Sequence, residues 1–171
     1  MKNIIYLACA LLVFTSCQQQ SKIGYVDNGI LINEFQEKID LEAKFQVKED
    51  AFRKKFDSID QAFQLEVQQF QADANKMTQS KAQEKYQELG QKKQMQDQQR
   101  QLEAQQFQQE FQNEIDSLIV KVKAFVKDYG KNNGYTYILG TSEAAASVLY
   151  GTEENDLTKT VLEALNAESK K

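Results

Sequence analysis

The sequence predicts a mainly α protein with a small β body (α+β class), in which a long antiparallel helical hairpin projects from that body. Between Leu31 and Tyr129, apolar residues recur mostly at steps of three or four, the spacing of one helix face. The chain has no Pro, and no Gly lies between Leu41 and Leu89, so the residues that most often interrupt helices are missing there. Strand-like segments occur only near the two ends of the sequence.

Residues 1–16 are expected to be a lipoprotein signal peptide. Lys2 supplies a positive start, and the apolar run 4–14 is too short to span a bilayer with ease. Thr15 and Ser16 stand directly before Cys17, which resembles the lipobox of bacterial lipoproteins, where the cysteine becomes the acylated first residue. We therefore expect Cys17 to anchor the protein to an envelope membrane. An ordinary secretory signal that ends near a cysteine is the alternative.

Residues 17–21 are expected to form a polar tether between this anchor and the folded part. Cys9 would leave with the signal peptide, so the mature chain would keep one cysteine and could form no internal disulfide. The mature chain is about one domain in length.

Residues 22–30 and 130–167 are predicted to form the body. Residues 22–27 have strand character, and Asp27 or Asn28 is placed to cap the helix after them. Gly130 is placed to end the second arm in a left-handed conformation.

Two further strands and a helix are predicted after Gly130, at residues 135–139, 147–150 and from about 157. Asn155 or Asp156 is expected to cap this last helix, and its apolar residues share one face. They are Leu157, Val161, Ala164 and Leu165. A body this small with open strand edges predicts association with other copies of the chain.

Residues 31–129 are predicted to be the hairpin arm, with its turn near residues 78–80. Ser80 and Gln83 read as a capping box at the start of the second helix. A fold-back there pairs Phe35 with Phe125 and Phe45 with Ile115. Arms of this length extend roughly 75 Å at about 1.5 Å per residue.

Several function classes are poorly supported. The chain has no His and no Trp, and a Gly-rich phosphate loop is missing, so we expect no enzymatic activity, no cofactor and no metal site. The formal net charge is −4, whereas nucleic-acid binding begins with a basic footprint. We therefore expect no nucleic-acid partner.

The hairpin tip carries a local excess of positive charge. From residue 76 to 100 there are six basic and three acidic residues, a net charge of +3. The basic residues are Lys76, Lys81, Lys85, Lys92, Lys93 and Arg100. They predict a tip that meets acidic clients or anionic lipid, and a plain solvated helix surface is the alternative.

Both ends of the chain resemble the Skp family of periplasmic chaperones, also called the OmpH family. Residues 22–27 (KIGYVD) are similar to the first strand of that family. The closing pattern is more specific: residues 134–139 (GYTYIL), 148–150 (VLY) and 156–158 (DLT), then Val161, Leu165 and Asn166. Leu157 stands where Ile is commoner in the family. The similarity covers residues 22–166, and the middle matches in character only.

This resemblance implies a homotrimer without enzymatic activity. Strands would form a shared body, and three hairpins would surround a cavity that holds unfolded outer-membrane proteins. The well-known family members are soluble and basic, whereas this chain is acidic and has a lipidation signal. We therefore predict a lipid-anchored periplasmic holdase. A structural envelope lipoprotein with a coiled-coil spacer or docking arm is the alternative.

Overall fold

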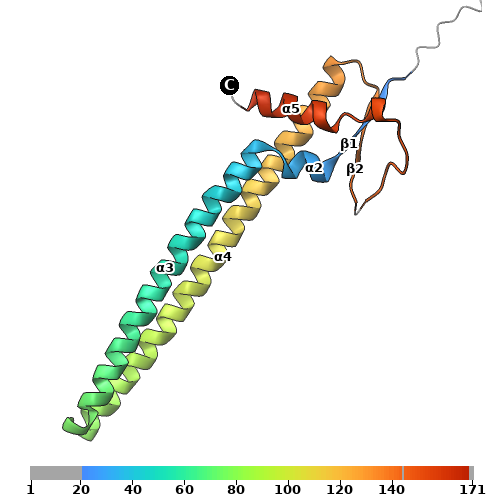
Figure 1. Ribbon diagram of the computed structural model, residues 1–171. Coiled ribbons are helices and arrows are strands. Elements are labelled where there is room, and N and C mark those ends of the chain that lie inside the picture. The colour runs from blue at the N-terminus through green and yellow to red at the C-terminus, as the bar shows by residue number, and fades with distance from the viewer. Residues whose placement is uncertain (1–20, 144, 170–171) are drawn as a thin grey trace, which may run out of the picture.

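The computed structural model describes residues 21–143 and 145–169. They form a small body and a long helical hairpin that extends from it (Figure 1). This confirms the predicted fold class. The expected signal peptide 1–16, Cys17 and nearly all of the tether 17–21 lie outside the described residues.

The sheet of the body has two parallel strands, β1 (Ile23–Asp27) and β2 (Tyr137–Thr141). Ile23 lies opposite Tyr137 at one end, and Asp27 lies opposite Thr141 at the other. Parallel neighbours cannot be joined by a tight turn, because the chain must return to the same end of the sheet. Here the whole hairpin is the crossover connection.

The chain passes directly from β1 into a short helix, α2 (Asn28–Asn33). Asp27 caps this helix, since its Oδ1 accepts hydrogen bonds from the backbone N–H groups of Gly29 at 2.7 Å and Ile30 at 3.0 Å. A carboxylate there satisfies N–H groups that have no partner within the helix. Of the two expected caps, the structure therefore selects Asp27.

The sequence predicted that the first arm begins at Leu31 and continues as one helix, but the structure has a break shortly after Leu31. Glu34 and Phe35 separate α2 from α3 (Gln36–Asp73). Phe35 has an extended backbone, with ψ of 123°, and its side chain is fully buried. Burying a whole aromatic side chain offsets the hydrogen bonds that the break removes, because such burial is among the largest favourable contributions of a residue.

The arm reverses direction through η1 (Ala74–Lys76) into α4 (Gln79–Asn132). The predicted capping box was wrong: Thr78 is the N-cap, and its hydroxyl accepts from the Lys81 N–H at 3.4 Å. Ser80 instead lies within the first turn of α4. Both residues carry a hydroxyl of similar capping strength, so local sequence did not distinguish them.

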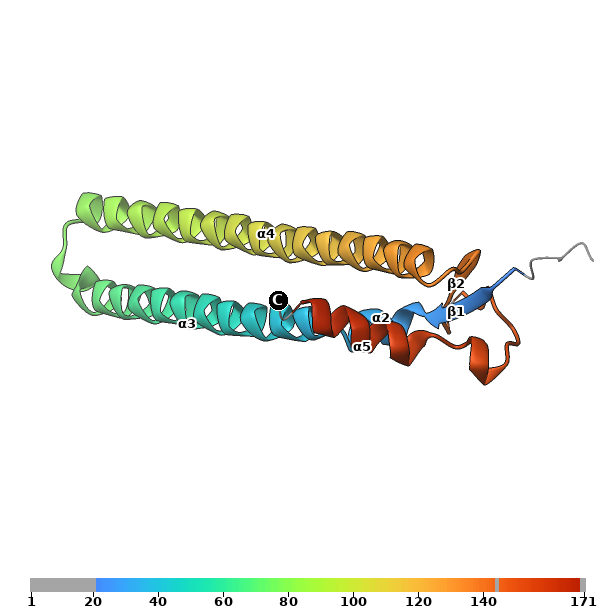
Figure 2. The same ribbon diagram turned by 90° about the horizontal axis from the view of Figure 1, so that it is seen from above.

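α3 and α4 lie side by side along the whole hairpin in both views (Figures 1 and 2). α4 has 54 residues, which corresponds to about 80 Å. Phe45 packs on Phe107 and Phe111, with ring centroids 5.4 and 4.9 Å apart. The chain reverses at residues 74–78, a few residues before the predicted turn near residues 78–80.

Gly130 does not end the second arm. α4 continues to Asn132, and Gly134 is the residue with a left-handed backbone, at φ of 72°. Gly130 is buried inside the helix, where an added Cβ would lie 3.1 Å from Cδ1 of Ile138. Its lack of a side chain therefore permits close packing against β2, and the turn chemistry belongs to Gly134.

The predicted third strand at residues 147–150 is absent from the described structure. The place beside β1 is taken by Asp156, which forms an isolated parallel bridge with Tyr25 after η2 (Glu153–Asn155). The Leu157 N–H donates to the Tyr25 carbonyl at 2.8 Å. Backbone that leads into the last helix thus covers part of the strand edge, and residues 147–150 are left on the surface.

The last helix, α5 (Thr158–Glu168), lies across the junction of body and arms (Figures 1 and 2). The Oδ1 atom of Asp156 accepts from the Thr158 N–H at 2.9 Å and from its hydroxyl at 2.6 Å. The Thr158 hydroxyl in turn accepts from the Asp27 N–H at 2.9 Å. The N-cap position of α5 is Leu157, which has no side-chain cap, and Asp156, one of the two predicted caps, accepts from the helix N-terminus one residue earlier.

The core gathers where α2, α4, α5 and β1 meet. The predicted apolar face of α5 is buried, with Leu157, Val161 and Leu165 at most 6% exposed. The members of the core cluster are Val26, Leu31, Phe35, Leu118, Val122, Leu157, Val161 and Leu165. Among the described residues, none of the helices is both long enough and apolar enough to span a membrane.

Candidate functional site

Two of the six predicted tip cations, Lys85 and Lys92, form ion pairs with Glu66 of α3. The Nζ of Lys85 lies 3.2 Å from Glu66 of α3 and 3.0 Å from Glu88 of its own helix. Lys92 pairs with the other oxygen of Glu66. Hydrogen bonds from Lys92 and then Lys85 lower the pKa of Glu66. One carboxylate thus joins two turns of α4 to α3.

Asp60 forms a second cross-arm centre, closer to the body. Arg100 pairs with it, and the Nζ of Lys93 lies 3.6 Å from Asp60 and 2.7 Å from Asp97. The hydrogen bond from Arg100 is the main cause of a lowered Asp60 pKa. The same guanidinium lies over the ring of Phe56, 5.0 Å from the centroid, in a cation–π arrangement.

The remaining two predicted cations lie at the turn itself. Lys76 pairs with Asp73 of the same arm at 2.9 Å. Lys81 is exposed, and no carboxylate of the described residues pairs with it. Of the six predicted residues, Lys81 is therefore the cation most available to a partner.

The hairpin tip as a folded unit carries no excess charge. Between residues 60 and 100, the six predicted cations are matched by six carboxylates. These are Asp60, Glu66, Asp73, Glu84, Glu88 and Asp97. The expected charge of +3 counted the residues from Lys76 onward, and folding places the carboxylates of α3 beside them.

Several large apolar side chains stand outside the seam between the arms. Val47, Leu65, Met95 and Leu102 are each more than half exposed on α3 or α4. The sequence did not lead us to assign them a role, although apolar residues at positions outside the regular helical repeat could have indicated exposed apolar contacts. They provide isolated apolar contacts along both arms.

A shallow hollow lies on one side of α4 near its middle. Phe107 and Phe111 line it, and four of the other five lining residues are glutamines. The full lining is Gln105, Phe107, Gln108, Gln109, Phe111, Gln112 and Asn113. No charged side chain lines it, and the amides offer both donors and acceptors to an exposed backbone.

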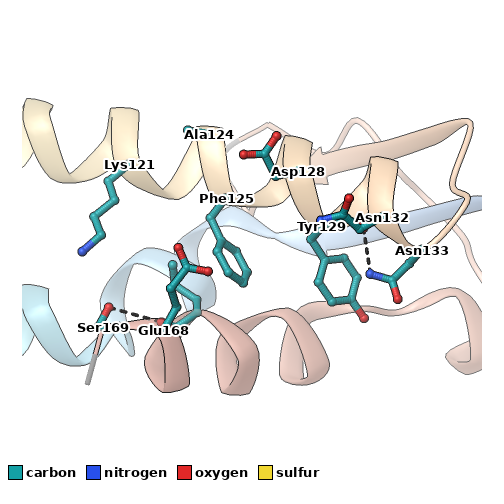
Figure 3. A pocket seen from close by; sticks show the side chains of 10 residues that line it. Lys121, Ala124, Phe125, Asp128, Tyr129, Asn132, Asn133, Glu168 and Ser169 are labelled. Carbon is teal, nitrogen blue, oxygen red and sulfur yellow. Dashed lines mark hydrogen bonds between the residues drawn. The ribbon is translucent and has the colours of Figure 1, made fainter. Parts of the chain in front are cut away.

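At the root of the arms a cavity of about 270 Å³ lies between α4 and α5. Phe125 and Tyr129 point from α4 toward α5 (Figure 3). Leu165 of α5 also lines the cavity. Lys121 and Glu168 belong to its rim. No group of residues that could hold a metal ion occurs in residues 21–143 and 145–169.

The body carries its own apolar surface. Leu149 and Tyr150 are 91% and 86% exposed, and Tyr137 on β2 is 60% exposed. β2 pairs only with β1, so its other edge is open within the described chain. An open strand edge and exposed apolar side chains are each suited to association with another chain.

Comparison with known proteins gives two positive findings. The family model described as "Outer membrane protein (OmpH-like)" matches residues 22–165. The fold is similar to the crystal structure of a candidate OmpH-like outer membrane chaperone from Caulobacter crescentus CB15. That similarity has a TM-score of 0.78 at 12% identity, over 86% of this chain and 85% of the other. No curated protein matches the chain.

Proposed function

The chain belongs to the OmpH-like outer membrane protein family, and from this premise we propose that it is a periplasmic holdase chaperone. It encloses unfolded outer-membrane proteins and prevents their aggregation. The family is non-enzymatic and its members act in the periplasm. The observation that carries the proposal is the length of the arms, which extend far beyond the core that holds the body together.

The arm surface supports weak and repeated contact with an unfolded chain. Exposed apolar side chains such as Val47 and Leu102 are spaced along it, and amide-rich stretches separate them. Each contact is weak by itself, whereas many contacts on one molecule raise the overall affinity. A holdase needs this combination, because the client must later be released.

We further propose that the protein is a homotrimer assembled through the body. The open edge of β2 and the exposed side chains of Tyr137, Leu149 and Tyr150 support this arrangement. Three hairpins projecting from one body surround a common space. Such a space would shield an unfolded client from other unfolded chains.

Acylation of Cys17 would tie this assembly to a membrane. The proposal is supported by the residues before Cys17 and by the polar stretch after it. Stable anchoring requires more than one lipid chain. Mass spectrometry of the membrane fraction is expected to find an acylated N-terminal Cys17, and an unmodified soluble chain that begins after Cys17 would exclude the anchor.

The predicted contact role of the six tip cations remains a proposal, with Lys81 its best-placed member. Lys85, Lys92, Lys93 and Arg100 are engaged across the arms, so an acidic client would have to compete with Glu66 or Asp60 for them. Reversing the charge of Lys81 alone tests client contact without disturbing these pairs.

The decisive experiment shortens the arms while it keeps the turn and the body. Deleting residues 60–73 and 87–100 removes two heptads from each arm and leaves the reversal at residues 74–78 in place. We expect the shortened protein to keep its oligomeric state in sedimentation. In a light-scattering assay, it should lose protection of an unfolded outer-membrane barrel several-fold.

A control and a contrary result complete the test. The matched control is the undeleted chain, which has the same turn and body, and Lys81→Glu in that chain tests the tip cation separately. If the shortened protein prevents aggregation as well as the full chain, the arms do not hold the client. The protein is then better described as an envelope lipoprotein whose hairpin is a spacer.

A further inference from the structure

The part of the hairpin nearest the body is held by aromatic packing. Phe45 of α3 contacts Phe107 and Phe111 of α4, and Phe56 of α3 is buried farther along the same stretch at 4% exposure. Ion pairs flank this packing, as between Lys55 and Glu103 or Lys48 and Glu110, without replacing it. Aromatic and aliphatic burial depends little on dissolved ions at moderate concentration.

Beyond Phe56 the seam still holds partly buried Phe63 and Phe70 on α3 and buried Leu89 on α4, but α4 becomes poorer in apolar residues. From Leu89 to Arg100, α4 offers only Met95 as a further apolar residue, and Met95 is 63% exposed rather than packed between the arms. Two buried polar atoms there, Oε1 of Gln96 and Nε of Arg100, have no hydrogen-bond partner among the described residues. Unpaired buried groups cost free energy, so this stretch is held less firmly than the aromatic one.

The ion pairs found across the distal seam all join a carboxylate of α3 to a cation of α4. α3 contributes two carboxylates, and α4 contributes four cations that converge on them in pairs. We call this set the ionic clasp: Asp60, Glu66, Lys85, Lys92, Lys93 and Arg100. Its side chains keep 29 to 44% of their surface exposed, so dissolved ions reach them.

We propose that the ionic clasp is a conformational device that lets the distal hairpin open in response to competing ions while the aromatic seam stays closed. Opening requires no unfolding of either helix, because each is held by its own backbone hydrogen bonds. Exposed ion pairs are screened over about 10 Å at 0.1 M salt and over about 3 Å at 1 M. The two halves of the arm therefore respond differently to the same solution.

This inference concerns the hairpin itself and does not depend on the chaperone proposal. If the chaperone proposal also holds, an arm that opens at its far end adapts the enclosed space to clients of different size. Regions with few buried contacts open at low free-energy cost, and between Leu89 and Arg100 α4 contributes only the exposed Met95 as a further apolar residue. The clasp sets where that opening begins.

The test measures the separation of the arms at two levels in the full mature chain. Spin labels at Gln69→Cys and Gln91→Cys report on the distal arm, and labels at Lys44→Cys and Glu114→Cys report on the proximal arm. Both pairs use a Cys17→Ser background, and labelled protein is diluted with unlabelled protein so that only distances within one chain are observed. Pulsed electron paramagnetic resonance gives the distance distributions at 50 mM and 1 M NaCl.

We expect the distal distribution to shift to longer distances and broaden at 1 M NaCl, while the proximal distribution stays unchanged. The double variant Asp60→Asn with Glu66→Gln should be broad already at 50 mM NaCl and should not respond to salt. The matched control is Asp57→Asn with Glu49→Gln, which removes the same charge from exposed positions of α3 that make no cross-arm ion pair in the described structure.

Two results would overturn the proposal. One is a distal distribution of unchanged width between 50 mM and 1 M NaCl. The other is an equal effect of the control and clasp variants, since the opening would then follow from net charge and not from the clasp. Circular dichroism at both salt concentrations identifies a variant whose helices have melted, and helix loss in place of separation also counts against the clasp.

Discussion

At the scale of single residues, Asn166 supplies a cap that α3 cannot make for itself. The N-cap of α3 is Phe35, which has no side-chain acceptor, and the Oδ1 of Asn166 accepts from the Gln36 N–H at 2.9 Å. These residues are 130 positions apart in the sequence. α5 therefore caps the first turn of α3 through the side-chain amide of Asn166.

Asn166→Ala should lower the free energy of unfolding by about 1 kcal/mol, the usual value of an N-cap. Asn166→Asp keeps an oxygen acceptor and should retain most of that stability. Urea titration followed by circular dichroism measures both. Asn113→Ala, on an exposed position of α4, is the matched control and should change stability little; an equal loss there would contradict the capping role.

Thr158 is the buried polar residue that joins β1 to α5. It is 6% exposed, and its hydroxyl accepts from the Asp27 N–H while it donates to Asp156. Thr158→Val leaves the Asp27 N–H without a partner and should cost about 1–3 kcal/mol. Thr160→Val, exposed on the same helix, should cost far less in the same denaturant series; similar losses would refute the argument.

At the scale of elements, the pKa shifts of the ionic clasp predict its response to acid. Arg100 and Lys93 lie beside Asp60, and Lys92 and Lys85 lie beside Glu66; in each case hydrogen bonds to cations lower the carboxyl pKa. Carboxylates with a lowered pKa contribute stability that is present at neutral pH. That contribution is lost as pH falls through the lowered values, below the ordinary range of about 4.

The distal labels at residues 69 and 91 should therefore keep their separation from pH 8 to pH 5 and move apart only below about pH 4. Labels at residues 44 and 114 monitor the aromatic seam over the same range. In the double variant Asp60→Asn with Glu66→Gln, the distance between the distal labels should not change as the pH falls. A distal opening that begins between pH 8 and pH 5 would point to a different group.

At the scale of the whole molecule, two substitutions of an apolar residue by aspartate distinguish a residue needed for folding from one proposed to act in assembly. Val161 is fully buried in the core, whereas Leu149 is 91% exposed on the body. Val161→Asp places an unpaired charge in the core, costs several kcal/mol and should unfold the body. Leu149→Asp should leave each chain folded and, if the body trimerises there, dissociate the oligomer.

Circular dichroism and sedimentation velocity measure the two outcomes independently. Leu149→Ser is the milder control, which removes the apolar side chain without adding a charge. An oligomer that persists in Leu149→Asp would exclude this face from the interface. A monomeric wild-type protein at micromolar concentration would exclude the proposed trimer altogether.

The long helices, their hairpin arrangement and the presence of a small β-containing body could be predicted from the amino-acid sequence. These features depend on local composition: a regular apolar step between Leu31 and Tyr129, the lack of Pro, and the caps at Asp27 and Asp156. Periodicity and capping depend on residues that are a few positions apart in the sequence, so the sequence alone indicates them. The closing residues also carried the family resemblance that the family match to residues 22–165 supports.

Which residues meet across the molecule could be learned from the folded chain alone. The fold paired Phe45 with Phe107 and Phe111, moved the left-handed turn from Gly130 to Gly134, and left residues 147–150 without a strand. It also placed carboxylates of α3 beside the predicted tip cations. The net charge of +3 on residues 76–100 is therefore neutralised when the facing residues of α3 are included. Coulomb attraction and packing depend on distance in space, and a small change in where the chain reverses shifts every partner along the arms.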